Sequence, residues 1–306
     1  MSERDMIPGL RGELRTGEPM AKHVSWRAGG AARVFYTPAN VADLCAFLRT
    51  RPADEPILFV GLGSNLLVRD GGFPGAVVMT HHALTGIEFV AEPGVARPTF
   101  KAGAGVPLPH LARFAAKHGA GGGEWMAGVP GTVGGALTMN AGCYGGETWD
   151  HVIVAETVDR HGNLRLRKPA DYAIGYRHLA LREANEEWFL SGVFAFERGD
   201  EAASMQRMKE LLSKRVASQP LNQPNAGSVF RNPEGDHAAR LIESCALKGF
   251  AIGGAQVSTK HANFIVNLGT ATAADIESLV MHVRDVVRGR TGVELHPEVR
   301  IVGEPR

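Results

Sequence analysis

A glycine-rich stretch from Gly121 to Gly146, GGGEWMAGVPGTVGGALTMNAGCYGG, places the strongest constraint on what this chain can fold into. Large apolar side chains, among them Trp125 and Leu137, stand between the glycines, which a plain surface loop does not require. Glycine lacks a Cβ atom, so such a backbone can pass close to another group while it stays inside the protein. Two interpretations fit equally well: the stretch lines a flat, bulky cofactor such as a dinucleotide, or it is a tightly packed core.

Length and composition describe a globular protein without a dominant charge. The 306 residues are enough for two or three domains, and 44% hydrophobic residues suffice for ordinary cores. Lys and Arg number 33 against 32 Asp and Glu, which argues against nucleic acid or an anionic membrane as a partner. The sequence has no apolar run long enough for a transmembrane helix and no secretory signal, and its three cysteines form no disulfide framework. We therefore expect a cytoplasmic protein.

Hydrophobic periodicity predicts a mixture of helices and strands. Residues 1–22 are predicted to be a loose leader. Helices are expected after the N-cap residues Asn40 and Asp200, over residues 105–119, from the N-cap Asp236 to Gly249, and over residues 272–290. Residues 151–167 alternate like a hairpin that turns at His161–Asn163. Strict alternation of strand and helix fails around this hairpin, so the expected fold class is α+β.

A second glycine turn, GLGSNLL from Gly61 to Leu67, follows an apolar strand. It lacks the third glycine and the following helix of a Rossmann motif. Its backbone N–H groups could still bind phosphate oxygens, although an ordinary tight turn explains the residues as well.

Several kinds of catalytic site are not indicated. There is no P-loop and no zinc-type histidine spacing, so no metal is expected. Ser228 lies in NQPNAGSVFRNP, which is not the Gly-x-Ser-x-Gly setting of a hydrolase elbow and has Asn225, not glycine, three residues before the serine. Its neighbours are turn-forming residues, so a plain turn is the alternative to a functional serine. Arg177 in GYRH and Glu298 in LHPEVR are, taken alone, ordinary solvated charges.

Taken together, seven blocks resemble the UDP-N-acetylenolpyruvoylglucosamine reductase family in order and spacing, over residues 24–303. These blocks are SWRAGGAARVFYTP, VGLGSNLLVRDGGFPG, GVPGTVGGALTMNAGCYG, GYRH, QPLNQPNAGSVFRNP, GGAQVSTKHANFIVN and LHPEVRIVG. The resemblance implies an α+β protein with an FAD-binding fold of the vanillyl-alcohol-oxidase/p-cresol-methylhydroxylase type and a separate α+β substrate-binding domain. The implied division is a leader (1–22), an FAD-binding region (23–199, with subdomains 23–80 and 81–199), a substrate-binding domain (200–290) and a C-terminal strand (291–306) returning to the first subdomain.

The activity implied by the resemblance is NADPH-dependent reduction of UDP-N-acetylglucosamine enolpyruvate to UDP-N-acetylmuramate through FAD, for peptidoglycan synthesis. Arg177 would stabilise the charge that develops on the substrate carboxylate, because a guanidinium offers a fixed fork of donors. Glu298 would act protonated, or share a proton with a neighbouring donor, since an ionised carboxylate would repel that charge. Ser228 would protonate the carbanionic carbon as a general acid.

The resemblance also implies the binding residues. The cofactor residues would be Gly61, Leu62, Gly63, Ser64, Asn65, Gly128, Val129, Pro130, Gly131, Gly134, Gly135, Asn140, Ala141 and Gly142. The substrate residues would be Arg215, Gln219, Asn232, Gln256, Lys260, His261, Asn263 and Arg300, with a packed structural histidine as the alternative for His261. We expect a monomer whose partners are NADPH and the sugar nucleotide.

Only a short stretch of sequence separates Arg177 from the helix after Asp200. In this respect the chain resembles the family branch that lacks an inserted tyrosine loop. Two other functions stay open. An oxidase of the same fold would show rapid reaction of its reduced flavin with oxygen. A nucleotide-sugar-binding regulator would bind a UDP-sugar without flavin.

Overall fold

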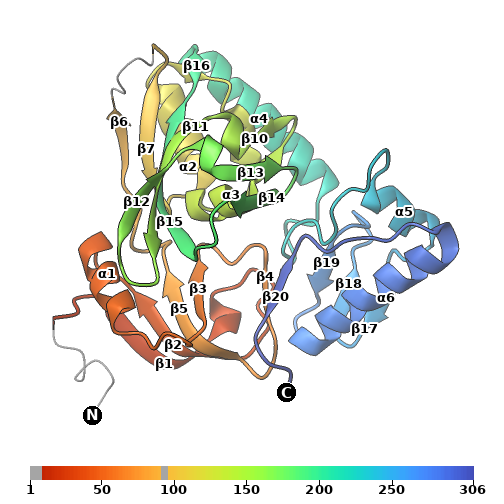
Figure 1. The fold of residues 1–306 in the computed structure, drawn as a ribbon. Helices are drawn as coiled ribbons and strands as arrows, with labels where there is room; N and C mark the ends of the chain where they lie inside the picture. The colour runs from red at the N-terminus through yellow and green to blue at the C-terminus, as the bar shows by residue number, and fades with distance from the viewer. Residues whose placement is uncertain (1–8, 91–95) are drawn as a thin grey trace. The chain divides into compact units, whose positions relative to one another are not determined.

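A computed structural model describes residues 9–90 and 96–306 of the chain (Figure 1). These residues form two compact units, each assembled from separate stretches. The first unit takes in the described parts of Met1–Thr16, Val34–Leu62 and Ala76–Ser213, and the second takes in Gly17–Arg33, Gly63–Gly75 and Lys214–Arg306. Helices and strands are mixed along the whole chain, which confirms the α+β class.

A four-stranded sheet is built from the N-terminal part of the chain. Its order is β1 (Glu13–Pro19), β2 (Ala31–Thr37), β5 (Phe73–Met79) and β3 (Ile57–Val60), and β3 and β5 run parallel. Helix α1 (Val41–Arg49) begins where expected, because the Asn40 side chain accepts a hydrogen bond from the Asp43 N–H at 3.0 Å. Leu44 and Phe47, on its inward face, are fully buried.

A five-stranded antiparallel sheet forms the larger part of the first unit. Its order is β12 (Leu164–Arg167), β11 (Val152–Asp159), β15 (Glu187–Ala195), β7 (Thr99–Gly103) and β6 (Ile87–Val90). Helices α2 (Leu108–Lys117) and α3 (Val133–Met139) share a core with this sheet. Met126 and Leu137 are fully buried in that core, so the glycine-rich stretch supplies part of it.

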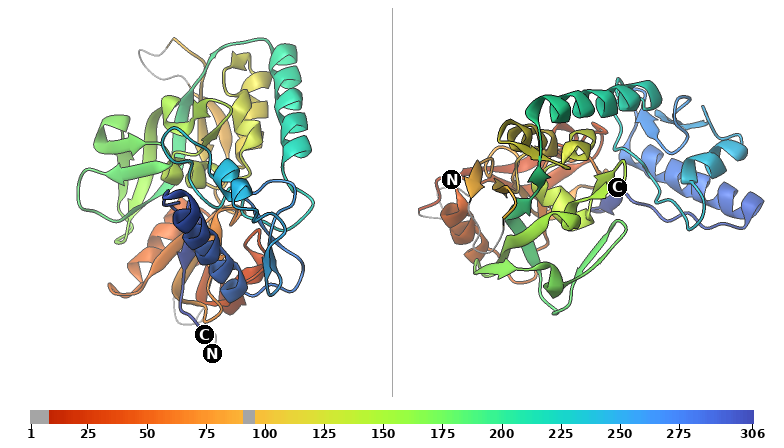
Figure 2. Two further views of the ribbon diagram at one scale, coloured as in Figure 1. Left: turned by 90° about the vertical axis from the view of Figure 1, so that its right-hand side faces the viewer. Right: turned by 90° about the horizontal axis from the view of Figure 1, so that it is seen from above.

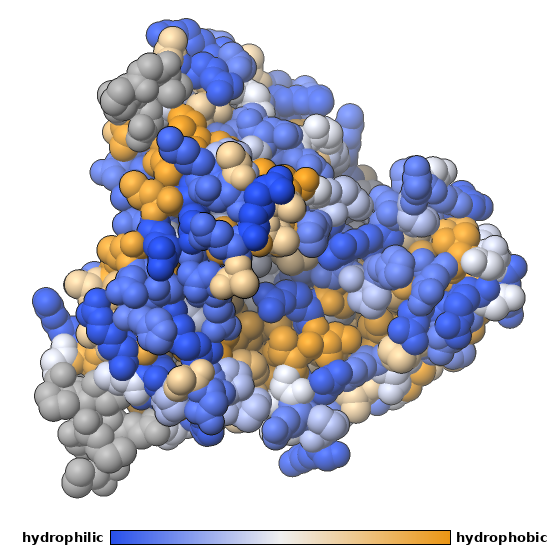
Figure 3. Space-filling model, in the orientation of Figure 1, coloured by the Kyte–Doolittle hydropathy of each residue, from blue (hydrophilic) through white to orange (hydrophobic). Residues whose placement is uncertain are grey.

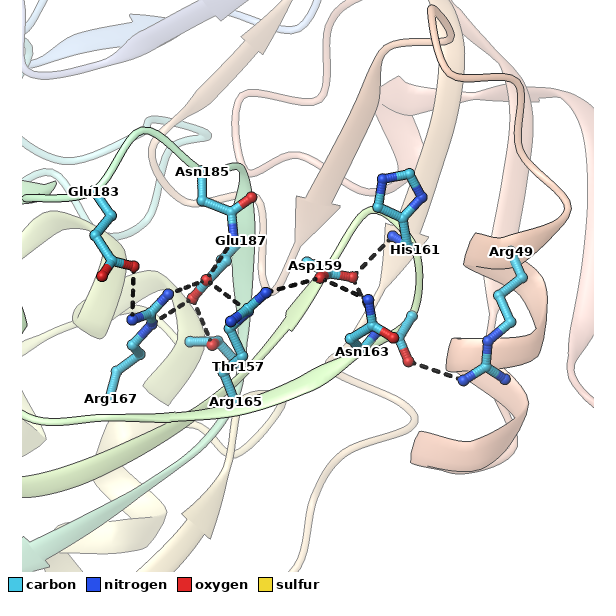
Figure 4. A network of polar contacts seen from close by, with 11 residues as sticks. Arg49, Thr157, Asp159, His161, Asn163, Arg165, Arg167, Glu183, Asn185 and Glu187 are labelled. Carbon is cyan, nitrogen blue, oxygen red and sulfur yellow. Dashed lines mark hydrogen bonds and ion pairs between the residues drawn. The ribbon is translucent and has the colours of Figure 1, made fainter.

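The predicted hairpin is confirmed as β11 and β12, which pair antiparallel. Polar side chains form hydrogen bonds and ion pairs at its turn and along β12 (Figure 4). At the turn, Asp159 accepts hydrogen bonds from the N–H groups of His161 and Asn163, both at 2.9 Å. From the end of β12, Arg167 forms a bidentate ion pair with Glu187, the first residue of the neighbouring strand β15 (Glu187–Ala195).

Helix α4 (Glu201–Ser218) lies beside α2 in both views of Figure 2. As predicted, Asp200 caps it: the Asp200 carboxylate accepts a hydrogen bond from the Ala203 N–H at 2.8 Å. Met208 and Leu211 form its buried face within the first unit.

The second unit contains a three-stranded antiparallel sheet and two helices. The strand order is β17 (Ala251–Ile252), β18 (Ala255–Val257) and β19 (Ile265–Asn267), and the helices are α5 (Ala238–Ser244) and α6 (Ala273–Thr291). The apolar stripe of α6 is buried, namely Ile276, Leu279, Val280, Val283 and Val287. The C-terminal strand β20 (Arg300–Val302) pairs in parallel with β4 (Leu66–Val68).

Short elements complete the fold. They are the 3-10 helices η2 (Met20–Lys22), η3 (Glu124–Gly128), η4 (Thr148–Asp150) and η5 (Pro169–Asp171), and the strand pairs β8 (Ala120–Gly121) with β16 (Glu197–Arg198), β9 (Gly142–Cys143) with β10 (Gly146–Glu147), and β13 (Tyr172–Gly175) with β14 (His178–Leu181).

Two expectations about elements were wrong. Residues 9–22 of the predicted loose leader contain β1 and η2, while residues 1–8 lie outside the described residues. Helix α5 is shorter than expected, because its first N–H, that of Ala238, is capped by Asn232 rather than Asp236, at 3.1 Å. It ends at Ser244, shortly before Ala246 adopts a left-handed φ of 54°. The functional division at residues 199 and 290 remains a prediction.

On the face drawn in Figure 3, hydrophilic and hydrophobic residues are interspersed. Within residues 9–90 and 96–306, no helix is long and apolar enough to cross a membrane. The same ranges hold no cluster of three or more His, Cys, Asp or Glu residues suited to a metal ion.

Candidate active site

Ser228 lies on a turn whose shape is set by the two residues before it. The Asn225 side chain accepts a hydrogen bond from the Gly227 N–H at 2.9 Å. Gly227 has a φ of 75°, and a Cβ atom placed on it would meet nothing within 4 Å. Glycine is therefore favoured here by its backbone conformation and not by lack of space. The turn leaves Ser228 half-buried.

Asn263 holds the segment that follows Ser228. Its side chain accepts a hydrogen bond from the Phe230 N–H at 3.0 Å and donates one to the Phe230 carbonyl at 2.8 Å. Its own carbonyl accepts a hydrogen bond from the Val229 N–H at 2.9 Å. Asn263 is 4% exposed. These contacts favour a supporting role for Asn263 over the predicted contact with substrate.

Glu298 is brought next to the Ser228 turn by a short antiparallel pairing. The Glu298 N–H donates to the Val229 carbonyl at 2.8 Å, and Phe230 lies opposite Pro297. Ser228 and Glu298 both belong to the second unit. The structure thus brings together two of the three predicted catalytic residues, although they are far apart in the sequence.

Asn65 links the glycine turn to Glu298 and to the start of β20. Its side chain donates a hydrogen bond to the Glu298 carbonyl at 3.1 Å, and its carbonyl accepts one from the Arg300 N–H at 3.0 Å. Part of the predicted phosphate turn is therefore bonded directly to Glu298 and to the first residue of β20.

The glycine turn itself fits the phosphates of a dinucleotide. Within the described residues, no backbone N–H from Gly61 to Asn65 donates a hydrogen bond to another protein group. Gly63 has a φ of 60°, and a Cβ atom on it would lie 2.1 Å from the His23 carbonyl oxygen. A run of backbone N–H groups without protein acceptors is the arrangement that binds phosphate oxygens.

Arg177, in the first unit, occupies the turn between β13 and β14 with an uncommon φ of 51°. Its guanidinium donates to the carbonyls of Asn140, at 3.4 Å, and Gly142. In return, the Asn140 side chain donates to the Gly175 carbonyl at 3.0 Å. The Arg177 turn and the segment that the resemblance assigns to the flavin are therefore joined by hydrogen bonds in both directions.

Hydrogen bonds hold both the amide nitrogen and the amide oxygen of the Asn140 side chain. Its amide also donates to Glu147 at 2.9 Å, and its oxygen accepts from the Trp149 N–H at 3.1 Å. The residue is 1% exposed and has a left-handed φ of 43°. This arrangement makes the side chain a support for the Arg177 turn and leaves the backbone for the predicted flavin contact.

The glycines of the central stretch are needed partly by the protein itself. A Cβ atom on Gly134 would lie 2.9 Å from the Ala104 Cβ, and one on Gly128 would lie 2.8 Å from the Tyr144 ring. Pro130 and Gly135 are nevertheless exposed. The stretch is thus a packed core on one side and an accessible backbone on the other, which reconciles the two interpretations of its sequence.

The predicted substrate residues all lie in the second unit. Two cations among them have local acceptors: the Arg215 Nε donates to Gln219 at 2.8 Å, and the Lys260 Nζ donates to the Val216 carbonyl at 2.6 Å. Gln256 donates to the Gly249 carbonyl at 3.1 Å, and the Arg300 side chain is exposed. The Asn232 side chain caps α5. Among the predicted substrate residues, Arg300 is therefore the one whose side chain has the fewest hydrogen bonds to other described residues.

His261 matches the alternative given for it. Burial lowers the pKa of its imidazole, with a further contribution from the charge of Lys248. The Asn263 N–H donates to Nδ1 at 3.2 Å, and the ring packs edge-on against Phe264 at 4.8 Å. A neutral, packed histidine accounts for all of these contacts.

Sequence reasoning missed two residues of this region. Asn225 was noted only as an exception to a hydrolase motif, although an Asn two residues before a glycine signals a side-chain-capped turn. Arg231 has no sequence pattern that sets it apart, and it becomes notable only through its buried Nε atom.

Two family models match this chain. Residues 219–302 match the C-terminal domain of UDP-N-acetylenolpyruvoylglucosamine reductase, and residues 32–166 match an FAD-binding domain.

Relatives of the same name match nearly the whole chain. The UDP-N-acetylenolpyruvoylglucosamine reductase of Thiobacillus denitrificans is 59% identical over 305 residues, covering 97% of this chain and 94% of that protein. The one from Alkalilimnicola ehrlichii is 54% identical over 303 residues, covering 99% and 98%. The crystal structure of UDP-N-acetylenolpyruvylglucosamine reductase from Thermus caldophilus is similar with a TM-score of 0.76 at 30% identity, covering 95% of this chain and 98% of that one.

Proposed function

Because the chain belongs to the UDP-N-acetylenolpyruvoylglucosamine reductase family, we propose that it reduces UDP-N-acetylglucosamine enolpyruvate to UDP-N-acetylmuramate with NADPH and FAD. The observation that carries this conclusion is the 59% identity to a relative of that name over 97% of the chain. The product is a peptidoglycan precursor. We infer that the reaction takes place in the cytoplasm and that the protein acts as a monomer.

FAD fits the residues present. The N–H groups of Gly61 to Asn65 would bind its phosphates, and the accessible backbone around Pro130 and Gly135 would face its ring. When bound, FAD supplies a carrier that accepts hydride from NADPH and passes it to the enolpyruvyl group.

Arg177 would stabilise the substrate as negative charge spreads into its carboxylate. Its guanidinium already donates to two carbonyl oxygens, those of Asn140 and Gly142, so its position is defined before substrate arrives. Preorganised donors of this kind lower the barrier because they need no rearrangement during the reaction.

Ser228 would donate the proton that completes the reduction. A hydroxyl is a weak acid, but it can protonate a carbanion-like carbon that it reaches directly. The turn formed by Asn225 and Gly227, together with the Asn263 contacts, supports this role by holding the serine on a defined backbone.

Glu298 would assist from the adjacent segment, which leads into β20. Its backbone is bonded to Val229 and Asn65, so it is held close to the serine turn. As a carboxylic acid it could donate a hydrogen bond to the intermediate, whereas its ionised form would oppose the developing charge.

An anaerobic absorbance titration tests this function. A yellow protein that is bleached by NADPH and recovers its colour on addition of the enolpyruvyl sugar nucleotide is the expected result. A flavoprotein that NADPH bleaches but the sugar nucleotide does not reoxidise would have another acceptor. A protein that does not bind FAD would contradict the proposal outright.

A further inference from the structure

Arg231 carries a buried hydrogen-bond donor that the fold does not use. Its Nε atom is buried and has no acceptor among the residues that the structure describes. Burying a charged donor without an acceptor is costly, and folded proteins retain few such groups without a reason. The carboxylate of Asp236, five residues further on, does not neutralise it, because Asp236 is paired with Arg240.

The position of Arg231 relates it to the proposed catalytic residues. Its N–H donates to the His296 carbonyl at 2.9 Å, and the Glu298 N–H donates to the Val229 carbonyl at 2.8 Å. These two bonds flank the pair formed by Phe230 and Pro297. Side chains alternate along such a pairing, so Arg231 and Glu298 project from the same face, opposite to Phe230.

The backbone at Arg231 is rigidly held. Phe230, directly before it, is 1% exposed, and both of its backbone polar groups are bonded to the Asn263 side chain. The backbone that carries the unused guanidinium donor is therefore held in place, three residues after Ser228 and on the face of Glu298. A cation whose buried Nε has no acceptor among the described residues, on a segment bonded to the one before Glu298, suits an anionic ligand.

We propose that Arg231 binds an oxyanion of the sugar nucleotide, either the enolpyruvyl carboxylate or the diphosphate. This assignment rests on the proposed function and adds a substrate-binding residue to those that the family resemblance supplied. A guanidinium suits both groups, because its planar fork of N–H donors matches two oxygens at once. A lysine at the same position would keep the charge and lose the fork.

The experiment measures the affinity of FAD-loaded protein for two ligands by calorimetry. One is UDP-N-acetylglucosamine enolpyruvate, and the other is UDP-N-acetylglucosamine, which has the diphosphate but no carboxylate. Arg231→Gln should weaken binding of the enolpyruvyl compound by about tenfold or more, the loss expected for charge-assisted hydrogen bonds. Arg231→Lys should recover part of that loss.

The second ligand identifies the group that is bound. If Arg231 binds the diphosphate, both ligands lose affinity equally, and if it binds the carboxylate, only the enolpyruvyl compound does. Arg288→Gln on the exposed part of α6 is the matched control and should bind both ligands as wild type does. Unchanged affinities in both Arg231 variants, with full flavin content, would overturn the assignment. If Arg231→Gln does not fold, Arg231→Lys alone decides, by losing affinity or keeping it. Failure of the wild-type protein to turn over the enolpyruvyl compound would overturn the proposed function itself, whatever the variants do.

Discussion

Three asparagine side chains position the residues proposed for catalysis, each by bonding to main-chain groups. Asn140 donates to the Gly175 carbonyl beside Arg177, Asn65 donates to the Glu298 carbonyl, and Asn263 brackets Phe230 after Ser228. An asparagine amide suits this task because it carries both a donor and an acceptor, as the backbone does. These contacts explain why residues expected to touch ligands are instead turned toward the protein.

The Asn140 contacts lead to a mutational prediction. In Asn140→Asp, a carboxylate oxygen would replace the amide donor that faces Glu147 at 2.9 Å and the Gly175 carbonyl at 3.0 Å. Repulsion should loosen the Arg177 turn and slow reoxidation of reduced flavin by the sugar nucleotide by up to about 100-fold, the cost of a small misplacement. Stopped-flow absorbance would measure both half-reactions. Asn222→Asp, at an exposed position, is the control. A larger effect on reduction by NADPH than on reoxidation would contradict the positioning role.

His151 leads to a prediction about pH. Burial lowers the pKa of its imidazole. The ring is neutral, since Nε2 accepts from Trp125 at 3.4 Å and Nδ1 is left to donate to the Ala195 carbonyl at 3.3 Å. The unfolded chain takes up a proton near pH 6.5 while the folded protein does not, so stability should be complete above about pH 6.5 and fall below it.

Denaturant unfolding between pH 5 and pH 8 would check this dependence, a range chosen about the ordinary histidine pKa. His151→Gln, which cannot titrate, should lose less stability than wild type as the pH falls. The same substitution at the exposed His110 should leave the wild-type dependence in place. An equally steep decline in His151→Gln would show that this residue does not contribute.

At the scale of the elements, the start of α6 is satisfied by a residue distant in sequence. The Asp70 carboxylate accepts from the N–H groups of Ala273 and Ala274 at 3.0 and 2.9 Å, while the Thr272 side chain caps Asp275. Arg69, next to Asp70, pairs with Glu277 on the same helix. A loop from the first quarter of the chain therefore completes a helix near its end.

Asp70→Ala should destabilise the protein by about 1–2 kcal/mol, because it removes two hydrogen bonds and a favourable charge from a helix N-terminus. Urea unfolding followed by circular dichroism would measure the change in the free energy of unfolding. Glu294→Ala, at an exposed acidic residue of the same unit, is the control. Equal stabilities of the two variants would contradict the capping role.

Elements were predictable where one local signal defined them. Helix α1 follows from its capping residue, α6 follows from a regular apolar stripe, and the β11–β12 hairpin follows from its turn. Strand β1 was missed because most of its residues are exposed and it depends on pairing with β2. The start of α5 was misplaced because Asp236 has the right residue type, while Asn232 has the right geometry.

The same distinction applies to the site. Ser228, Arg177 and Glu298 were identified through the family resemblance, and composition or periodicity alone would not have singled them out. The glycine turn was noted from its own residues, with an ordinary tight turn as the alternative. The supporting bonds of Asn65 and Asn140 join residues that are distant in sequence, so only the fold reveals them. The unused donor of Arg231 was likewise invisible in the sequence.

At the scale of the whole molecule, the chain is a family member that requires FAD, and cofactor removal should be evident in its stability. A ligand that binds only the folded state adds about 2.7 kcal/mol at a free concentration 100 times its Kd. Apoprotein should therefore unfold at a lower temperature than holoprotein, and the midpoint should rise with added FAD in scanning calorimetry. A midpoint that does not respond to FAD would contradict cofactor binding to the folded chain.

The central claim is that Ser228 acts only in the step that protonates the intermediate. The two half-reactions of Ser228→Ala test this claim most directly. Under anaerobic conditions, NADPH should bleach the flavin of this variant as fast as that of wild type. Reoxidation by the enolpyruvyl sugar nucleotide should slow by about 100- to 10,000-fold, the usual contribution of a general acid. Ser228→Cys should retain part of the rate, since a thiol can also donate a proton. Equal slowing of both half-reactions, or reoxidation at the wild-type rate, would contradict the account.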